Sequence, residues 1–361
     1  MEQALTSPKY KVTWKTIVLP IIGLVAFFLY IYIFKVDIQD IIVTVKSIHL
    51  NFYTAAVIAS LLDVLFFTLS WHFLLRFLLV KIPLLREFLF VWVGIFVDTM
   101  IPAESVSGEL TKIYLVNREQ NGTAGKATAS IVAQRLIGLS INIVLLSIGT
   151  VLLFVDNLLY GMMMWLILFL IVAMFIVLVL IMLLCRREKW TIGIIDALVK
   201  FAERITRGHW KLTKLKEEAK EAAKAFHSAI KEYGHAPKTI LAASAVSAMS
   251  WMFFLVVFYL TFLSIGYSQI SWSAILVISS IFMAVKSIPI GVPFEVGLPE
   301  ITLTTLLFFF GVPVQIAATA TLLMRLLTLW VRFFIGFGAQ QWLGIKEMTT
   351  SSGVKTSPPT N

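Results

Sequence analysis

Two short segments decide the fold: Asp98-Thr-Met-Ile-Pro102 and Lys286-Ser-Ile-Pro-Ile-Gly-Val-Pro293. Each ends an apolar stretch, the first of which begins at Phe88 and the second at Ser271. Proline has no N–H to donate and disfavours helix at the residue before it, while glycine adopts backbone angles that other residues avoid. Both stretches should therefore unwind. Because unwound backbone in a membrane is tolerated only beside protein or water, we predict two re-entrant or broken helical hairpins, with hinges at Pro102, Gly108, Pro289, Gly291, Pro293 and Gly297.

The composition is that of a membrane protein. Of the 361 residues, 59% are apolar and 14% are charged, whereas a soluble domain has about 45–50% apolar and about 25% charged residues. The mean hydropathy of +0.91 extends over the whole chain, which excludes a soluble enzyme with one anchor and also a disordered chain. The single cysteine, Cys185, allows neither an internal disulfide nor a cysteine metal cluster.

Six apolar runs are long enough to cross the hydrocarbon, which takes about 20 helical residues. They extend from Thr16 to Phe34, Phe52 to Leu79, Thr128 to Phe154, Leu158 to Leu184, Ile240 to Ile265 and Val314 to Leu343. Together with the two hairpins, they predict an all-α polytopic protein. We expect one integral-membrane domain over residues 1–348 and a disordered tail over residues 349–361.

Positive charge gathers in the segments that would face the cytoplasm. The segment from Arg186 to Lys238 holds 13 of the 30 lysines and arginines, and cytoplasmic loops are enriched in these residues. We therefore expect a multi-pass plasma-membrane protein with both termini in the cytoplasm, a first hairpin that opens inward and a second that opens outward. Apolar residues at helical spacing in segment 186–238 indicate amphipathic helices on the inner leaflet. A solvated connector is the alternative.

The two hairpin regions resemble each other in sequence. In the first region Glu109 precedes Arg135 by 26 residues, and in the second Glu300 precedes Arg325 by 25. Ile95-Phe96, Ile101-Pro102 and Arg135-Leu136 recur as Ile281-Phe282, Ile288-Pro289 and Arg325-Leu326. With opposite insertion, this similarity predicts inverted repeats over about residues 88–155 and 271–343. Secondary transporters use such repeats, with broken helices that meet near mid-membrane at the substrate site.

Ionisable residues within apolar segments are candidates for function, because charge in hydrocarbon is costly. A guanidinium group offers a planar fork to phosphate oxygens, and Arg325 and Arg332, seven residues apart, should lie on nearly the same helix face. The candidate substrate-binding residues are Arg135, Arg325, Arg332, Glu109, Glu300 and Lys286. The alternative is that the arginines and glutamates only neutralise each other within the protein.

A second set of acidic residues could serve coupling or gating. This set comprises Asp98, Glu104, Asp63 and Glu295. Asp63 is a candidate proton relay, although a bond to a neighbouring helix is an equal alternative.

Enzyme motifs are absent from the sequence. There is no Gly-x-x-x-x-Gly-Lys-Ser/Thr loop, no Gly-x-Ser-x-Gly elbow and no His-Glu-x-x-His motif, and the five histidines lack ligand spacing. We therefore expect no catalytic residue, no metal and no cofactor.

At Pro102, Gly108-Glu109-Leu110, Gln134-Arg135-Leu136 and Glu300, the chain resembles the lysylphosphatidylglycerol synthase/flippase membrane-domain family. This family includes the flippase half of the bacterial multiple-peptide-resistance factor. Two departures from the family pattern are Gln134, where glutamate is common, and Phe294-Glu295, which replaces a glycine pair before Gly297. The family's aminoacyltransferase domain is missing from this sequence, so we expect no synthesis of lysyl lipid.

The resemblance implies that the protein is a flippase for a phosphate-bearing polar lipid: a phospholipid, an aminoacyl-phospholipid or a polyprenyl-phosphate-linked lipid. The expected partners are membrane lipids with anionic headgroups rather than nucleic acid. Assembly into a homo-oligomer is compatible with the sequence. Two other classes of function compete with transport. One is a membrane-embedded lipid-modifying enzyme, and the other is a non-catalytic membrane scaffold subunit.

Overall fold

The computed structural model describes residues 39, 43, 46–101, 106–156, 161–193, 196–197, 213–287 and 297–353, and all secondary structure in these ranges is helical. The longer helices are α3 (Leu50–Phe77), α4 (Leu84–Met100), α5 (Val106–Glu119), α6 (Ala124–Val155), α7 (Gly161–Arg186), α9 (Thr213–Gly234), α10 (Pro237–Ser264), α11 (Trp272–Lys286), α12 (Leu298–Phe309), α13 (Val314–Arg325) and α14 (Arg332–Gly353). A π-helix, η2 (Leu326–Val331), joins the last two. The predicted all-α class is confirmed.

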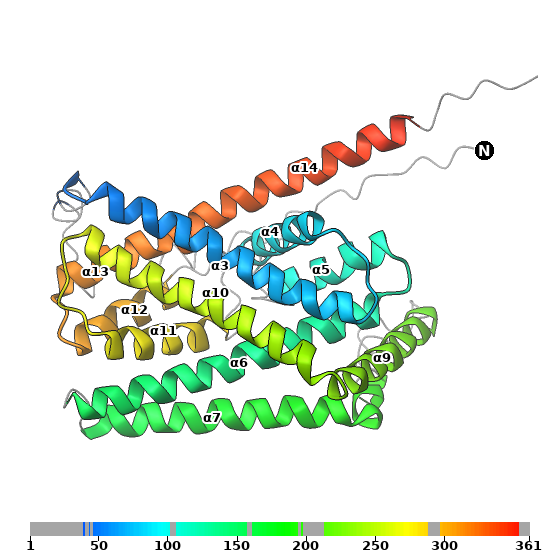
Figure 1. Ribbon diagram of the computed structural model, residues 1–361, viewed down its shortest axis with the longest axis horizontal. Helices are drawn as coiled ribbons and strands as arrows, with labels where there is room; N and C mark the ends of the chain where they lie inside the picture. The colour runs from blue at the N-terminus through cyan, green and yellow to red at the C-terminus, as the bar shows by residue number, and fades with distance from the viewer. Residues whose placement is uncertain are drawn as a thin grey trace, which may run out of the picture.

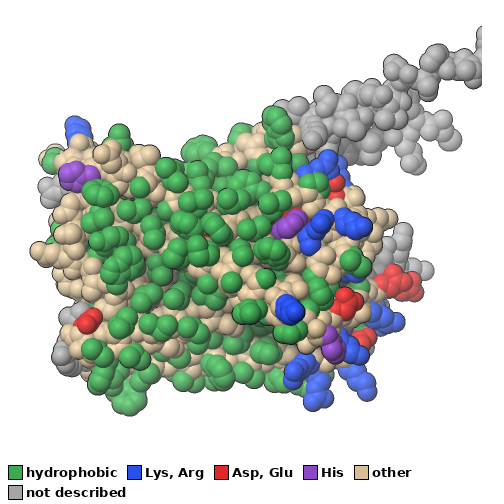
Figure 2. Space-filling view, viewed as in Figure 1, with side chains coloured by type: hydrophobic (Ala, Val, Ile, Leu, Met, Phe, Trp, Pro, Cys, Tyr) green, Lys and Arg blue, Asp and Glu red, His purple; other side chains and the backbone are tan. Residues whose placement is uncertain are grey.

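Five of the six predicted spans coincide with helices that are long and apolar enough to cross a membrane. Four are α3, α6, α7 and α10, and the fifth is the continuous run Val314–Gly344 through α13, η2 and α14. The predicted span from Thr16 to Phe34 lies outside the described residues. Apolar side chains cover the middle of the molecule in Figure 2, while most of the charged side chains gather at one end. We call this end, where α9 lies (Figure 1), the basic end.

The two short apolar hairpins enter from opposite ends of the molecule (Figure 1). The first, α4 and α5, enters from the basic end, and the second, α11 and α12, enters from the other end. Neither α4, with 17 residues, nor α11, with 15, is long enough to be a full span. Both therefore turn back inside the molecule, in the opposed manner that the sequence predicts.

The order of helices repeats along the chain. Helices α3, α4, α5 and α6 correspond to α10, α11, α12 and the run from α13 to α14. The two leading helices, α3 and α10, are antiparallel: the His49 N–H donates to the Ser264 carbonyl at 2.7 Å at one end, and the Ser70 hydroxyl donates to the Ala243 carbonyl at 2.9 Å near the other. This is the relation expected of inverted repeats around a pseudo-two-fold axis.

The first helix of each hairpin packs against a long helix of the other repeat. Helix α4 of the first repeat packs along α14 of the second, and α11 of the second packs along α6 of the first. A glycine allows the close approach at each interface. A Cβ added to Gly336 would lie 2.5 Å from the Trp92 carbonyl oxygen, and one added to Gly149 would lie 2.8 Å from Leu276 Cβ. Each hairpin is thus held against the long helix of the other repeat.

The longest described helix of the polar connector is the amphipathic helix α9, which packs on the basic end of α6. Its Tyr233 is buried, stacks on Phe77 and donates its hydroxyl to the Leu74 carbonyl at 2.8 Å. Burial raises the pKa of this phenol, which stays protonated and able to donate. At the other end of the chain α14 continues to Gly353, so residues 349–353 of the predicted disordered tail are helical.

Candidate functional site

The most buried ion pair of the described residues joins α12 to α13. Arg325 donates from Nε to Oε1 of Glu300 at 2.6 Å, and their side chains are 3% and 4% exposed. The other carboxylate oxygen, Oε2, accepts from the Gly297 N–H at 2.7 Å. Gly297 has φ = +106°, which favours glycine, and it lies directly before α12. Glu300 thus caps its own helix and holds the arginine of the next.

A second ion pair joins α5 to α6. Nε of Arg135 donates to Oε1 of Glu109, whose side chain is 24% exposed, whereas that of Arg135 is 41% exposed. Arg135 lies in the interior of a 32-residue apolar helix. A guanidinium at that depth needs an acidic partner or a polar cavity.

These two pairs occupy equivalent places in the two repeats. Each glutamate lies in the first turn of the second hairpin helix, α5 or α12, and each arginine lies on the helix that follows. The sequence reasoning from the similar Glu-to-Arg spacings therefore identifies the partners that the structure brings together. Their surroundings differ: the side chains of the pair in the second repeat are buried, whereas those of the pair in the first repeat are partly exposed to solvent.

Arg332 and Asp63 form a third pair, at the crossing of α3 with α10 and the start of α14. Arg332 Nη2 donates to Asp63 Oδ2 at 2.6 Å, and the Ser250 hydroxyl of α10 donates to Asp63 Oδ1 at 2.6 Å. Ser60 accepts from Arg332 at 3.3 Å. This placement gives Asp63 a cationic partner that the sequence did not identify.

The expectation that Arg325 and Arg332 share one helix face is wrong. The π-helix between them, Leu326–Val331, closes its hydrogen bonds over five residues rather than four, which changes the angle between successive side chains. Arg325 therefore contacts Glu300 of α12, while Arg332 contacts Asp63 of α3. The two arginines serve separate pairs.

Asp98 and Gly108 join the two helices of the first hairpin. Oδ1 of Asp98 accepts from the Gly108 N–H at 2.6 Å and from the Ser107 hydroxyl at 2.8 Å, so Asp98 caps α5. A Cβ on Gly108 would lie 2.3 Å from Asp98 Oδ2 and 2.4 Å from the Gly94 carbonyl oxygen. Gly108 therefore lies within α5 at a close helix–helix contact, not in an unwound hinge.

Sequence reasoning missed Lys112, which is buried on α5 one turn after Glu109. Its Nζ lies 5.3 Å from the Trp71 ring centroid and 5.4 Å from that of Phe67, both on α3. A cation over two aromatic faces is stabilised by their quadrupoles. The side-chain amide of Gln134, on α6, donates to the Phe67 carbonyl at 2.8 Å. A neutral amide therefore lies beside Phe67 at the position where the family commonly has a glutamate.

The remaining predicted residues lie at the hairpin ends. Lys286 is the last residue of α11 and is half-buried. Pro102, Glu104, Pro289, Gly291, Pro293 and Glu295 lie outside the described residues.

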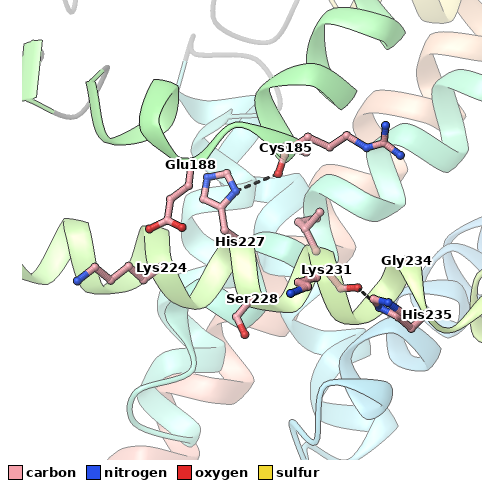
Figure 3. Close-up of a pocket in the computed structure, with 10 residues that line it drawn as sticks. Cys185, Glu188, Lys224, His227, Ser228, Lys231, Gly234 and His235 are labelled. Atoms are coloured by element: carbon pink, nitrogen blue, oxygen red, sulfur yellow. Dashed lines mark hydrogen bonds between the residues drawn. The ribbon is translucent and has the colours of Figure 1, made fainter.

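A pocket of about 500 Å³ lies between the end of α7 and α9, at the basic end (Figure 3). His227 donates from Nδ1 to the Cys185 carbonyl at 2.9 Å, and its Nε2 lies 3.0 Å from the Thr191 hydroxyl. These bonds attach the amphipathic helix to the membrane span. In the described residues, no group of three or more His, Cys, Asp or Glu side chains is arranged to hold a metal ion.

The fold and its charges define a class: a polytopic α-helical membrane protein of two inverted repeats, each with a broken hairpin and a Glu–Arg pair. The chain belongs to the family described as the lysylphosphatidylglycerol synthase TM region, whose model matches residues 17–336. It is 22% identical over 292 residues to the UPF0104 membrane protein PH1989 of Pyrococcus horikoshii, covering 80% of this chain and 85% of that protein. It is 24% identical over 335 residues to the UPF0104 membrane protein MJ1595 of Methanocaldococcus jannaschii, covering 91% and 95% respectively.

Proposed function

We propose that this protein is a flippase, which moves a phosphate-bearing polar lipid between the two leaflets of the plasma membrane. The lipid would be a phospholipid, an aminoacyl-phospholipid or a polyprenyl-phosphate-linked lipid. Its headgroup passes between the two hairpins while its tails stay in the surrounding hydrocarbon. The basic end faces the cytoplasm in this proposal, because lysine and arginine accumulate on the cytoplasmic side.

One observation carries the proposal: two equivalent Glu–Arg pairs differ in exposure. Arg135 is 41% exposed and Arg325 is 3% exposed, although both belong to the same position of an inverted repeat. Transporters with inverted repeats open one side at a time, and their halves exchange conformations during the cycle. The unequal exposure matches a conformation in which the first repeat is accessible and the second is closed.

The chemistry of the pairs suits exchange with a lipid phosphate. An arginine presents parallel N–H donors to two phosphate oxygens, just as it does to a carboxylate. When the site is empty, the glutamate holds the arginine and keeps its charge neutralised. When a lipid enters, the phosphate replaces the glutamate, which is then available to a cationic part of the headgroup. Charge is balanced in both states when the headgroup also carries a positive group.

Lipid movement in reconstituted vesicles tests the proposal. Purified protein is placed in liposomes that contain a fluorescent phospholipid, and a membrane-impermeant reductant measures how fast inner-leaflet lipid becomes accessible. We expect movement by the wild-type protein and a loss of most of it in Arg135→Gln. The matched control is Arg86→Gln, since Arg86, in the first turn of α4, forms an exposed pair with Glu119 at the outer end of the same hairpin. Equal rates in wild type, Arg135→Gln and protein-free liposomes would refute the proposal.

A further inference from the structure

A separate charged pair joins α3 to the base of the first hairpin. Glu87, in the first turn of α4, has a fully buried side chain, and its Oε2 atom lies 2.8 Å from Nδ1 of His72 on α3. The other carboxyl oxygen, Oε1, has no hydrogen-bond partner in the described part of the chain. A buried carboxylate is costly unless a proton or a cation neutralises it. This carboxyl group is therefore placed to hold a proton.

No charged side chain of the described surroundings forms an ion pair with Glu87 other than His72. Arg76, one turn further along α3, is exposed and influences both groups only through space. Four other charged or titratable groups on α4, α5, α6 and α9 have partners of their own: Arg86 with Glu119, Lys112 over Phe67 and Trp71, Lys126 on the Leu78 carbonyl, and Tyr233 on the Leu74 carbonyl. Lys238, at the start of α10, is exposed.

His72 is positioned to deliver a proton to this carboxyl group. Its side chain is 20% exposed, whereas that of Glu87 is 0% exposed, and it lies within two turns of the end of α3. Among the described residues, no side chain bonds its second ring nitrogen, Nε2. When Nε2 takes a proton from water, Nδ1 can pass its own proton to Oε2. The result is a neutral imidazole and a neutral carboxylic acid, with one proton gained.

The pair also lies where a change in charge would move the hairpin. Helix α4 begins beside Glu87, and about 16 Å further along its axis Asp98 holds the start of α5. The same helix is packed tightly against α14 of the second repeat, where Gly336 faces the Trp92 carbonyl. A shift of α4 would therefore reach both the Glu109–Arg135 pair and the opposite repeat.

Resting on the proposed lipid movement, we propose that His72 and Glu87 form a proton-binding site that makes this movement sensitive to the pH on the side of the membrane that the basic end faces. Loss of the proton leaves a negative charge in a fully buried place, which favours a conformation that opens the base of α4 to water. Gain of the proton neutralises the pair and favours the packed arrangement seen here. The proton thus shifts the first hairpin between its open and packed conformations, and the Glu–Arg pairs bind the lipid phosphate.

The test compares lipid movement at two pH values, one unit apart, on the side of the vesicle membrane that the basic end faces. The readout is the ratio of the two rates, whatever the basal rate of each variant. One pH unit changes the proton concentration tenfold, so a single titrating site predicts a ratio of up to about 10 in the wild type. We expect a ratio near 1 in Glu87→Gln and in His72→Asn. The matched control is Glu119→Gln, whose carboxylate is exposed, and it should keep the wild-type ratio.

The outcomes separate this inference from the proposed function. If Glu87→Gln fails to fold, His72→Asn decides, because it leaves the carboxyl group in place and removes only the relay. A wild-type protein that moves lipid with a ratio of 1 would overturn the inference and leave the flippase proposal standing. A wild-type ratio that persists in both variants would overturn it as well. An absence of lipid movement under every condition would refute the flippase proposal, and the proton-binding role with it.

Discussion

The buried Glu300–Arg325 pair makes a sharp prediction about stability. The variant Glu300→Gln keeps an acceptor for the Gly297 N–H but removes the negative charge from a pair whose side chains are 4% and 3% exposed. Arg325 would be left buried without its acidic partner, and breaking such a pair from one side costs about 3–5 kcal/mol. We therefore expect Glu300→Gln to lose about that much free energy of unfolding.

The equivalent pair in the first repeat supplies the control. The side chains of Glu109 and Arg135 are 24% and 41% exposed, and accessible pairs contribute about 0–1 kcal/mol. Glu109→Gln should therefore cost far less than Glu300→Gln, although the two residues occupy equivalent positions. The double variant Glu300→Gln with Arg325→Gln should recover most of the lost stability, because it leaves no uncompensated charge.

Denaturant unfolding in detergent, followed by tryptophan fluorescence, would measure these differences. Ten tryptophans provide the signal. The reasoning is refuted if Glu300→Gln loses no more stability than Glu109→Gln, since that result would mean that burial does not distinguish the two pairs. It is also refuted if the double variant is less stable than both of its single variants.

Two further predictions concern packing and topology. Gly108→Ala places a Cβ 2.3 Å from Asp98 Oδ2, and this overpacking should lower the free energy of unfolding by about 1–3 kcal/mol. In the control Gly138→Ala the added Cβ meets nothing within 4 Å, so this variant should be as stable as the wild type or more stable. Thermal unfolding of the two variants measures the difference. In a Cys185→Ser background, single cysteines at the exposed positions Asn121 and Gln269 should react with an impermeant maleimide from opposite sides of the membrane. Labelling of both from one side would contradict the opposed hairpins.

Much of the architecture could be predicted from local sequence. Apolar runs of about 20 residues mark spans because helices need that length to cross the hydrocarbon, and the prolines after Asp98 and Lys286 mark the broken elements. The Glu–Arg pairs were also predictable. The separation of Glu109 from Arg135, 26 residues, is close to that of Glu300 from Arg325, 25 residues, and buried charges require opposite partners.

Other features depend on contacts that local patterns do not encode. The π-helix lies in Leu326–Val331, an ordinary apolar segment, so its effect on Arg332 was not visible in the sequence. The partner of Arg332, Asp63, is 269 residues away. The position of Lys112 over the rings of Phe67 and Trp71 depends on where the fold brings α5 relative to α3, and its neighbours in sequence do not reveal it.

The rate of lipid movement by the double variant Glu300→Gln with Arg325→Gln, measured in proteoliposomes, tests the central claim most directly. This variant removes both charges together, so it separates a structural pair from a pair that exchanges with substrate. Our account predicts a protein that unfolds at nearly the wild-type denaturant concentration yet moves phosphate-bearing lipid at the rate of protein-free liposomes. Recovery of both stability and wild-type lipid movement would contradict it, because the pair would then only balance charge inside the protein.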